Sequence, residues 1–473
     1  MPARDFRMAF RTCEFTVPGP RSRPQPRRHP PTFWRSGRWL LAVVPLLLLV
    51  WAEPAQAYTW MIRHGYGGCP TCHADPSGGE LLTAYGRVQS DLILRMRYGS
   101  DSVSAASSES SSGDFDDFGD FGTEDSGGDS EPAAKEESKP EPEPPPEDEG
   151  SSINTSGFLF GAVTMPDALL LGGSFRYMNL YKLGNEDPFD TFPMQMDVYG
   201  QVEAGSFRAG ASIGAARVPA SSPHARAAQV TTGQGEQFNL ISRWHWLGFE
   251  LDPKTLLRAG RINLPFGVRI PEHTMWVREA TSTDRESDQQ HGIALAYNEA
   301  KMRAEGMAIL GNYQVNPDRF RERGYALYVE GLLSDALSFG ISSKITRARA
   351  DVVSVAAVTR QAHGPMLRAA FGETLVLLAE ADVLVKTNTS LGYVGFVQAD
   401  ILAVQGLHFM LTGEALDGGA LDASPKVTGA GKPRFGGWVS ANWHFFTHLD
   451  FRLDLVARQS DPLTILAQLH LFL

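Results

Sequence analysis

The sequence predicts an all-β protein, a transmembrane antiparallel β-barrel of about 16 strands that follows a short, mostly helical segment. Three observations predict this fold. Segments of about ten residues with alternating apolar and polar side chains follow one another through residues 153–473 without a helical pattern between them. The connections between these segments alternate between short and long. The last segment, residues 464–473, has the same pattern and ends the chain.

The first 57 residues have the features of a secretory signal peptide. Nine arginines precede an apolar run at residues 39–52, and Ala55-Gln56-Ala57 is a small-x-small cleavage site. The run is shorter than the roughly 20 residues that a membrane-spanning helix needs. We therefore expect cleavage before Tyr58, which also removes Cys13.

Residues 58–99 form the next segment, whose main feature is the motif Cys69-Pro70-Thr71-Cys72-His73. Two thiols at this spacing followed by histidine are typical of covalent c-type haem attachment, in which the histidine becomes the proximal iron ligand. A thioredoxin-type pair would open a helix within a βαβ pattern, and a zinc site needs four ligands, so both alternatives fit less well. We expect one covalent haem c in a cytochrome c-like segment that resembles c-type cytochromes, whose haem is attached after export.

A single amphipathic helix is expected after the motif. Residues 77–80 have the form of a capping box, and Leu81, Tyr85, Val88 and Leu92 recur at helical spacing. The apolar face of this helix would lie against the haem, or else against the barrel or a partner.

The distal iron ligand is not fixed by the motif. A haem used for electron transfer generally has two protein ligands. His64 lies five residues before Cys69 and would give a low-potential bis-histidine iron, whereas Met96 or Met61 would raise the potential. A partner protein is a further possible source of this ligand.

Residues 100–152 are predicted to be a disordered linker. They consist mainly of Ser, Gly, Asp, Glu and Pro, with 17 acidic residues against two lysines. The acidic charge of the mature chain is therefore concentrated in one segment. The remainder has no basic stripe, so we expect no nucleic-acid partner.

The barrel pattern of residues 153–473 is clear near Phe339 and Ile341, which alternate with Ser338, Ser342 and Lys344. Apolar side chains would face lipid and polar ones the lumen, with short connections on the periplasmic side. The predicted short connections are at Gly205, 252–254, 298–301, 334–335, 372–373, Gln405 and Thr447. Seventeen candidate strands are present, and single-chain bacterial barrels have even numbers, so we predict 16 without residues 155–164, with 18 as the alternative.

The longest connection begins after Arg261 and spans about 25 residues with charges of both signs. It either folds inward and sets the selectivity of the pore or is a surface loop whose charges are solvated. The candidate pore-loop residues are Arg261, Arg269, His273, Arg278 and Arg285. Four strand histidines, with no metal-ligand spacing, are expected to be polar lining of the lumen: His245, His408, His444 and His470.

The piece Arg261-Ile262-Asn263-Leu264-Pro265-Phe266-Gly267 resembles the phosphate-selective porin family, in which a similar Pro-Phe-Gly segment follows a strand. The resemblance covers this piece and the strand rhythm. It implies a porin-like barrel in the outer membrane but places no anion-binding residues, so it implies no phosphate selectivity.

Together these features predict an outer-membrane barrel whose covalent haem faces the periplasm on an acidic tether. The expected role is electron transfer at or across the outer membrane, with other cytochromes as redox partners. The alternative is a solute or anion channel in which the haem is a redox sensor or gate. We do not expect an enzyme, because a haem peroxidase needs a distal acid/base cluster and usually a second haem.

Overall fold

The computed structural model describes residues 61–64, 69–97, 159, 162–163, 165–166, 168–217, 229–231, 238–272, 274–313, 318–351, 355–419 and 431–473. The predicted signal peptide (1–57), the predicted linker (100–152) and the pore-loop candidate His273 lie outside these residues.

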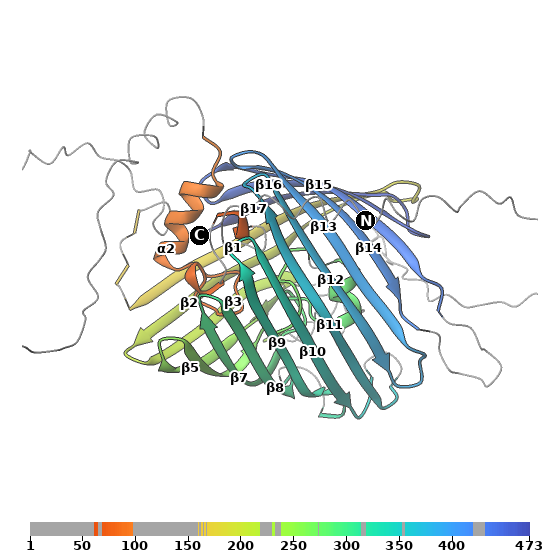
Figure 1. Cartoon of the computed structure of the whole chain (residues 1–473), viewed down its shortest axis with the longest axis horizontal. Helices are drawn as coiled ribbons and strands as arrows, with labels where there is room; N and C mark the ends of the chain where they lie inside the picture. Colours follow the sequence, from red (N-terminus) through yellow and green to blue (C-terminus); the bar gives the residue numbers. More distant parts are fainter. Residues whose placement is uncertain are drawn as a thin grey trace, which may run out of the picture. The chain divides into compact units, whose positions relative to one another are not determined.

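The described residues form a closed antiparallel β-barrel, shown in Figure 1. Closure is direct, because β1 pairs with both β2 and the final strand β17. The strands are β1 (Leu169–Lys182), β2 (Phe189–Ala204), β3 (Phe207–Arg217), β4 (Phe238–Ile241), β5 (His245–Asp252), β6 (Thr255–Ile262), β7 (Gln290–Glu299), β8 (Met302–Gly311), β9 (Arg323–Ser334), β10 (Leu337–Ala348), β11 (Val358–Phe371), β12 (Leu375–Lys386), β13 (Gly392–Val404), β14 (Leu407–Asp417), β15 (Arg434–Phe446), β16 (Leu449–Arg458) and β17 (Thr464–Phe472).

These strands occupy 16 positions around the barrel, which confirms the prediction. Strands β4 and β5 both pair with β3 and are one interrupted strand. At the interruption, the backbone N–H groups of Arg243 and Trp244 each donate to the hydroxyl of Ser212 at 3.0 Å. In an uninterrupted strand these two N–H groups would have carbonyl partners on the neighbouring strand, and the hydroxyl takes the place of those partners. Leu159, Ala162 and Val163 are not in a strand, as the choice of 16 required.

The alternation of side chains sets the two faces of the barrel. Phe339 and Ile341 of β10 are exposed on the outer face, whereas Ser338, Ser342 and Lys344 are buried inside. A soluble sandwich would bury the apolar face instead, so this arrangement is the one expected for strands in a lipid bilayer. His245 shares the outward face of β5 with Leu247, which is 58% exposed, so the expectation that it lines the lumen is wrong.

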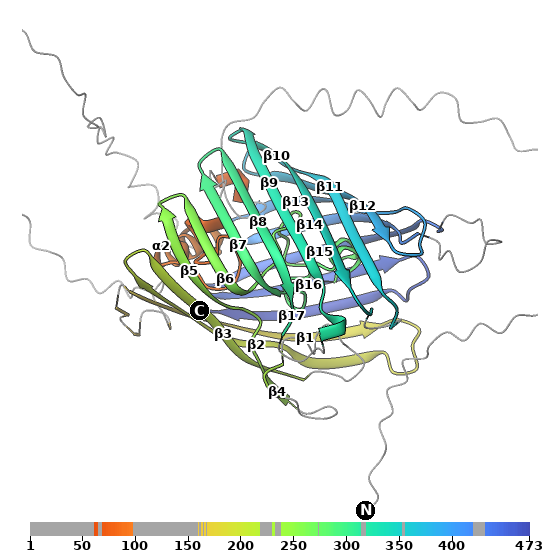
Figure 2. The same cartoon turned by 90° about the horizontal axis from the view of Figure 1, so that it is seen from below.

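All seven predicted short connections join consecutive strands, between β2 and β3, β5 and β6, β7 and β8, β9 and β10, β11 and β12, β13 and β14, and β15 and β16. Because antiparallel strands alternate in direction, these turns gather at one end of the barrel. The chain terminus after β17 lies at the same end, beside the N-terminal segment, in the two views of Figures 1 and 2.

The longest described connection, between β6 and β7, folds into the lumen. It carries a six-residue helix, α4 (Trp276–Thr281), which contacts β12, β13 and β14 on the opposite wall. Met275, Trp276 and Val277 are fully or almost fully buried there among apolar residues of the wall. The connection therefore folds inward, as one of the two alternatives has it, and its effect on selectivity stays a prediction.

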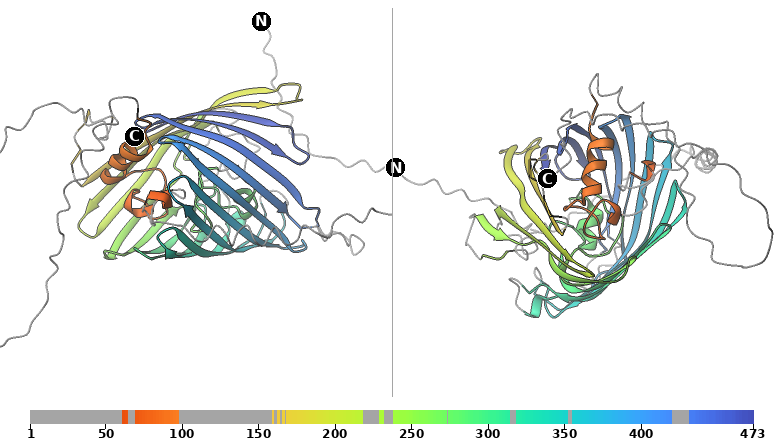
Figure 3. Two further views of the ribbon diagram at one scale, coloured as in Figure 1. Left: turned by 45° about the horizontal axis from the view of Figure 1, so that its top comes forward. Right: turned by 90° about the vertical axis from the view of Figure 1, so that its left-hand side faces the viewer.

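The N-terminal segment lies in the mouth of the barrel, as the right-hand view of Figure 3 shows. It contains 3-10 turns at Met61–His64 and Cys69–Thr71, the helix α2 (Ala84–Gln89) and a π-helical turn at Ser90–Leu94. Among the described residues, none of the helices has the length and apolar character to cross a bilayer.

The predicted helix start at Ser77 is wrong. The N-cap is Thr83, whose hydroxyl accepts a hydrogen bond from the N–H of Gly86 at 3.0 Å. Gly78, Gly79 and Glu80 all have positive φ, which a right-handed helix cannot include. Of the predicted apolar face, Leu81 is buried, whereas Tyr85, Val88 and Leu92 are 46%, 41% and 52% exposed and do not pack on the barrel.

Candidate functional site

A compact loop, residues 69–83, presents the CxxCH motif. The N–H of His73 donates to the carbonyl of Cys69 at 2.9 Å, which closes the turn. The N–H of Thr83 donates to the carbonyl of Cys72 at 3.0 Å and brings the start of α2 back onto the motif. A Cβ on Gly86 would lie 2.1 Å from that same carbonyl oxygen, so only glycine permits this approach.

Ion pairs fix this segment to strands on two sides of the barrel. Arg63 pairs with Asp400 of β13 at 2.5 Å, and both side chains are fully buried. Asp75 pairs with Arg258 of β6 at 2.7 Å. Breaking a buried pair of this kind by removing one partner costs roughly 3–5 kcal/mol, because it leaves an uncompensated charge.

Backbone contacts add to these pairs. The pore-loop arginines Arg269 and Arg285 donate to the carbonyls of Pro76, at 3.1 Å, and Gly78. Arg87 of α2 donates to the carbonyl of Leu171 in β1. Near the end of the segment, Gln405 donates to the carbonyl of Leu92 at 2.7 Å, so the segment also contacts the short connection between β13 and β14.

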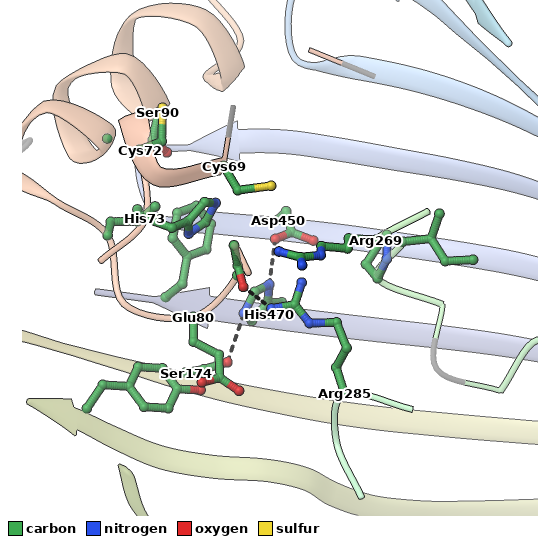
Figure 4. A pocket seen from close by; sticks show the side chains of 18 of the residues that line it. Cys69, Cys72, His73, Glu80, Ser90, Ser174, Arg269, Arg285, Asp450 and His470 are labelled. Carbon is green, nitrogen blue, oxygen red and sulfur yellow. Dashed lines mark hydrogen bonds and ion pairs between the residues drawn. The ribbon is translucent and has the colours of Figure 1, made fainter. Parts of the chain in front are cut away.

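The side chains of Cys69, Cys72 and His73 line one cavity between this segment and the barrel (Figure 4). The cavity encloses about 1390 Å³ of empty space, including its open mouth. The barrel contributes Ser174, Arg176, Tyr199, Asp450 and His470, the segment contributes Met61 and Glu80, and the pore loop contributes Arg269, Arg278 and Arg285.

The two thiols differ electrostatically. Burial raises the pKa of Cys72 to about 11. Burial acts on Cys69 in the same direction, but the guanidinium groups of Arg303 and Arg269 outweigh it and leave the pKa of Cys69 below its usual value. Arg303 donates to the Cys69 sulfur at 3.1 Å.

The imidazole of His73 is neutral at physiological pH. Burial, together with the charge of Arg285, lowers the pKa of His73 to about 4. Neutral imidazole is the form that binds metal ions. Beside it, burial and the charge of Glu286 raise the pKa of Glu80 well above its usual value, so this carboxyl holds a proton.

The two predicted distal ligands do not line this cavity. Burial lowers the pKa of His64 to about 4, and the charges that act on it come from Arg63 and His408. The sulfur of Met96 accepts a hydrogen bond from Trp443 at 3.3 Å. The backbone N–H of Met96 donates to the carbonyl of His444 at 2.9 Å. Met61 does line the cavity and is 3% exposed.

Of the predicted pore-loop residues, Arg269, Arg278 and Arg285 line the cavity and Arg261 does not. Arg278 pairs with Glu380 of β12 and donates to the carbonyl of Val268 at 2.9 Å. Arg261 is buried at the base of the loop, where it donates to the carbonyl of Arg243 at 2.6 Å and to Gln289 at 3.2 Å.

Asp450 and Ser174 are site residues that the sequence analysis did not select. Asp450 and His470 are Cα partners across the β16–β17 hairpin, and their side chains are hydrogen-bonded at 2.9 Å. Their equal distance from the hairpin turn is a sequence signal that could have paired them. Ser174 has no such signal, because it meets His470 only through closure of β1 on β17.

No protein-family model and no curated protein matches the chain. Solved structures to which it is similar include OmpT, an outer membrane protein of Vibrio cholerae in its trimer form (10% identity, 64% of this chain and 99% of that chain, TM-score 0.49). Others are the outer membrane channel DcaP of Acinetobacter baumannii (11%, 64% and 97%, TM-score 0.45) and an anion-selective porin from Comamonas acidovorans (10%, 64% and 99%, TM-score 0.45). At these values the similarities carry no conclusion about what the lumen binds or conducts.

Proposed function

We propose that this chain is a porin-like barrel of the outer membrane that carries one covalently bound c-type haem and transfers electrons at or across that membrane. The observation that carries this proposal is the position of the CxxCH motif. Both thiols and the His73 imidazole line a cavity whose other walls are barrel strands and the pore loop. A haem held there would lie in the lumen of the pore, not on a detached domain.

The residues present fit a haem in three respects. Cys69 and Cys72 are both free thiols. His73 is neutral and partly buried. The cavity also contains the guanidinium groups of Arg176, Arg269 and Arg285, which suit the two carboxylates of a haem.

Among the described residues, no group of three or more His, Cys, Asp or Glu side chains could hold a bare metal ion. A haem iron does not need one, because the porphyrin supplies four nitrogens.

The roles of the chain's own residues follow from these contacts. Cys69 and Cys72 would hold the cofactor through thioethers, and His73 would donate its nitrogen lone pair to the iron. Arg269 and Arg285 fix the loop that bears the motif, and the strands limit the access of water. When bound, the haem supplies one-electron redox chemistry.

Orientation in the membrane is part of the proposal. Short connections face the periplasm in barrels of this kind, and the N-terminal segment contacts the short connections at Gln405 and at Thr447, which donates to Asp91. The haem would therefore face the periplasm from within the mouth of the barrel. One haem cannot span about 25 Å of apolar barrel alone, so a second redox protein is required as partner.

The first experiment expresses the full chain in bacteria that have a cytochrome c maturation system. We expect haem-stained protein in the outer-membrane fraction, with a c-type reduced-minus-oxidised spectrum. The matched control is the double variant Cys69→Ser and Cys72→Ser, which should insert an equal amount of heat-modifiable barrel without haem. Wild-type barrel in the outer membrane without covalent haem would overturn the proposal.

The second experiment tests electron transfer itself. Intact cells with oxidised haem receive an electron donor that cannot cross the outer membrane. Reduction of the haem, and its absence in cells with the double cysteine variant, is the expected result. No reduction, even with added periplasmic cytochromes, would contradict transfer across the membrane.

A redox-gated solute channel is the second candidate function, and the docking of the segment in the mouth favours it. Polar contacts hold the segment there, so a change of charge at the site could release it. Planar-bilayer recordings at oxidising and reducing potentials test this function. Conductance that differs between the two potentials in wild type, but not in the double cysteine variant, would support a gate.

A further inference from the structure

Of the described residues that line the cavity, two besides His73 carry an imidazole or a thioether that can bind haem iron. They are His470 of β17 and Met61 of the segment. Met61 lies in an apolar cluster with Ile62 and Leu94. His470 comes from the barrel wall and is held on both ring nitrogens (Figure 4).

The hydrogen bonds of His470 fix its tautomer. Its Nδ1 lies 2.9 Å from Oδ2 of Asp450, and a carboxylate only accepts, so the Nδ1 carries the proton. The Nε2 therefore keeps its lone pair. A carboxylate behind a histidine in this manner is the usual second partner of a metal-ligating imidazole, because it orients the ring and raises its basicity.

Among the described residues, the hydrogen-bond partner of the Nε2 is the hydroxyl of Ser174, at 3.0 Å. This hydroxyl also lies 3.1 Å from Oε1 of Gln195, whose amide nitrogen donates to Asp197 and Tyr199. The amide orientation makes Oε1 the acceptor, and a serine hydroxyl has one proton to give. If the Nε2 loses its contact with Ser174, the serine hydroxyl still donates its proton to Gln195, so no buried donor is left without a partner.

We infer that His470 is the second axial ligand of the haem iron, so that the barrel wall, and not the N-terminal segment, completes the coordination. Asp450 is its positioning residue. This inference rests on the proposed function, because it requires haem on Cys69 and Cys72. It goes beyond that function in stating that the iron itself ties the segment to the last strand of the barrel.

The test uses the full-length, haem-loaded protein purified from outer membranes in detergent. Haem content, spin state from optical and electron paramagnetic resonance spectra, and CO binding after reduction are measured together. We expect wild type to be six-coordinate and low-spin with two histidines, and not to bind CO. In His470→Ala the iron should become high-spin and bind CO, and added imidazole should restore the low-spin spectrum.

Three matched variants separate the other candidates: Met61→Leu, His64→Ala and Met96→Leu. Each should keep the low-spin spectrum. A high-spin iron in any of them, or a low-spin iron in His470→Ala at full haem content, overturns the inference. Wild type that binds CO overturns it as well, whereas wild type without covalent haem overturns the proposed function instead.

A second variant guards against misfolding of His470→Ala, which gel mobility before and after heating would reveal. Asp450→Asn keeps an acceptor for the Nδ1 proton but removes the charge. We expect the low-spin spectrum to remain and the haem midpoint potential to rise, because the imidazole becomes a weaker donor. An unchanged potential would contradict His470 as the ligand, because a merely structural Asp450 has no reason to act on the iron.

Discussion

Two segments enter the lumen of this barrel, and they are held there in different ways. The pore loop between β6 and β7 is tied to the wall at both ends and packs Met275, Trp276 and Val277 into an apolar cluster. The N-terminal segment buries its charged residues Arg63 and Asp75 in ion pairs, while Tyr85 and Leu92 stay exposed. Each segment also has some contacts of the other kind, because Arg278 of the pore loop pairs with Glu380, and Met61, Ile62 and Leu94 belong to the apolar cluster of α4. The two segments therefore differ in the balance between apolar packing and buried ion pairs.

Loss of one ion pair of the N-terminal segment should have the largest effect. Asp75→Leu leaves Arg258 buried without this partner, at a cost of roughly 3–5 kcal/mol, and should release the segment from the lumen. Limited proteolysis of the detergent-solubilised barrel should then cleave within residues 61–97, and single-channel conductance should increase. Arg97→Ala, whose hydrogen bonds to the carbonyls of Asp91 and Leu92 stay within the segment, is the control. Equal protection in both variants would mean that the pair does not hold the segment.

A matched change in the pore loop should act on selectivity and leave the loop in place. Arg278→Met removes the partner of Glu380, while the apolar contacts of α4 remain. The lumen gains negative charge, so preference for cations should rise severalfold. Reversal potentials in a salt gradient measure this. A loop that becomes protease-sensitive instead would show that the charge pair, and not packing, holds it.

A smaller effect is expected where α2 touches the motif. Gly86→Ala introduces a Cβ at 2.1 Å from the carbonyl oxygen of Cys72, so the helix must move away. We expect about 1–3 kcal/mol of lost docking stability, measured as a lower temperature at which the segment becomes protease-sensitive. Gly418→Ala, where nothing lies within 4 Å of the added Cβ and φ is not positive, is a control for the general effect of glycine replacement. Equal shifts in the two variants would contradict a specific contact.

The smallest effect should come from an ion pair outside the lumen. Lys254 and Glu299 are 2.5 Å apart on adjacent short turns and are 51% and 43% exposed. Exposed pairs contribute about 0–1 kcal/mol, so Lys254→Ala should leave proteolysis, conductance and the unfolding temperature unchanged. A change as large as that of Asp75→Leu would mean that burial does not decide how much an ion pair contributes to stability.

The barrel was predictable from sequence because each strand has one face toward lipid and the other toward the lumen. A lipid-facing Ile341 and a lumen-facing Ser342 must alternate, and the tight turns between strands can be recognised from their residues. The CxxCH motif was recognisable because covalent haem attachment generally requires this spacing, and the haem itself stays a prediction. The start of helix α2 was predicted wrongly because a glutamate at position 80 gives no indication of the left-handed backbone that the chain has there.

The docking of the segment was not predictable. Arg63 and Asp400 are 337 positions apart, and each looks like an ordinary surface residue in the sequence. The contact between Ser174 and His470 has the same origin, because it exists only once β1 meets β17. His64 and Met96 were natural candidates on chain proximity alone, and barrel closure brings a different imidazole to the cavity.

The pairing of the first strand with the last also sets an order of assembly. The wall that carries Ser174, Asp450 and His470 is incomplete until the very end of the chain has been made and has closed the ring. The N-terminal segment also contacts β6 and β13, but its cavity needs this last wall as well. Closure of the ring is therefore the step that completes the site around Cys69, Cys72 and His73.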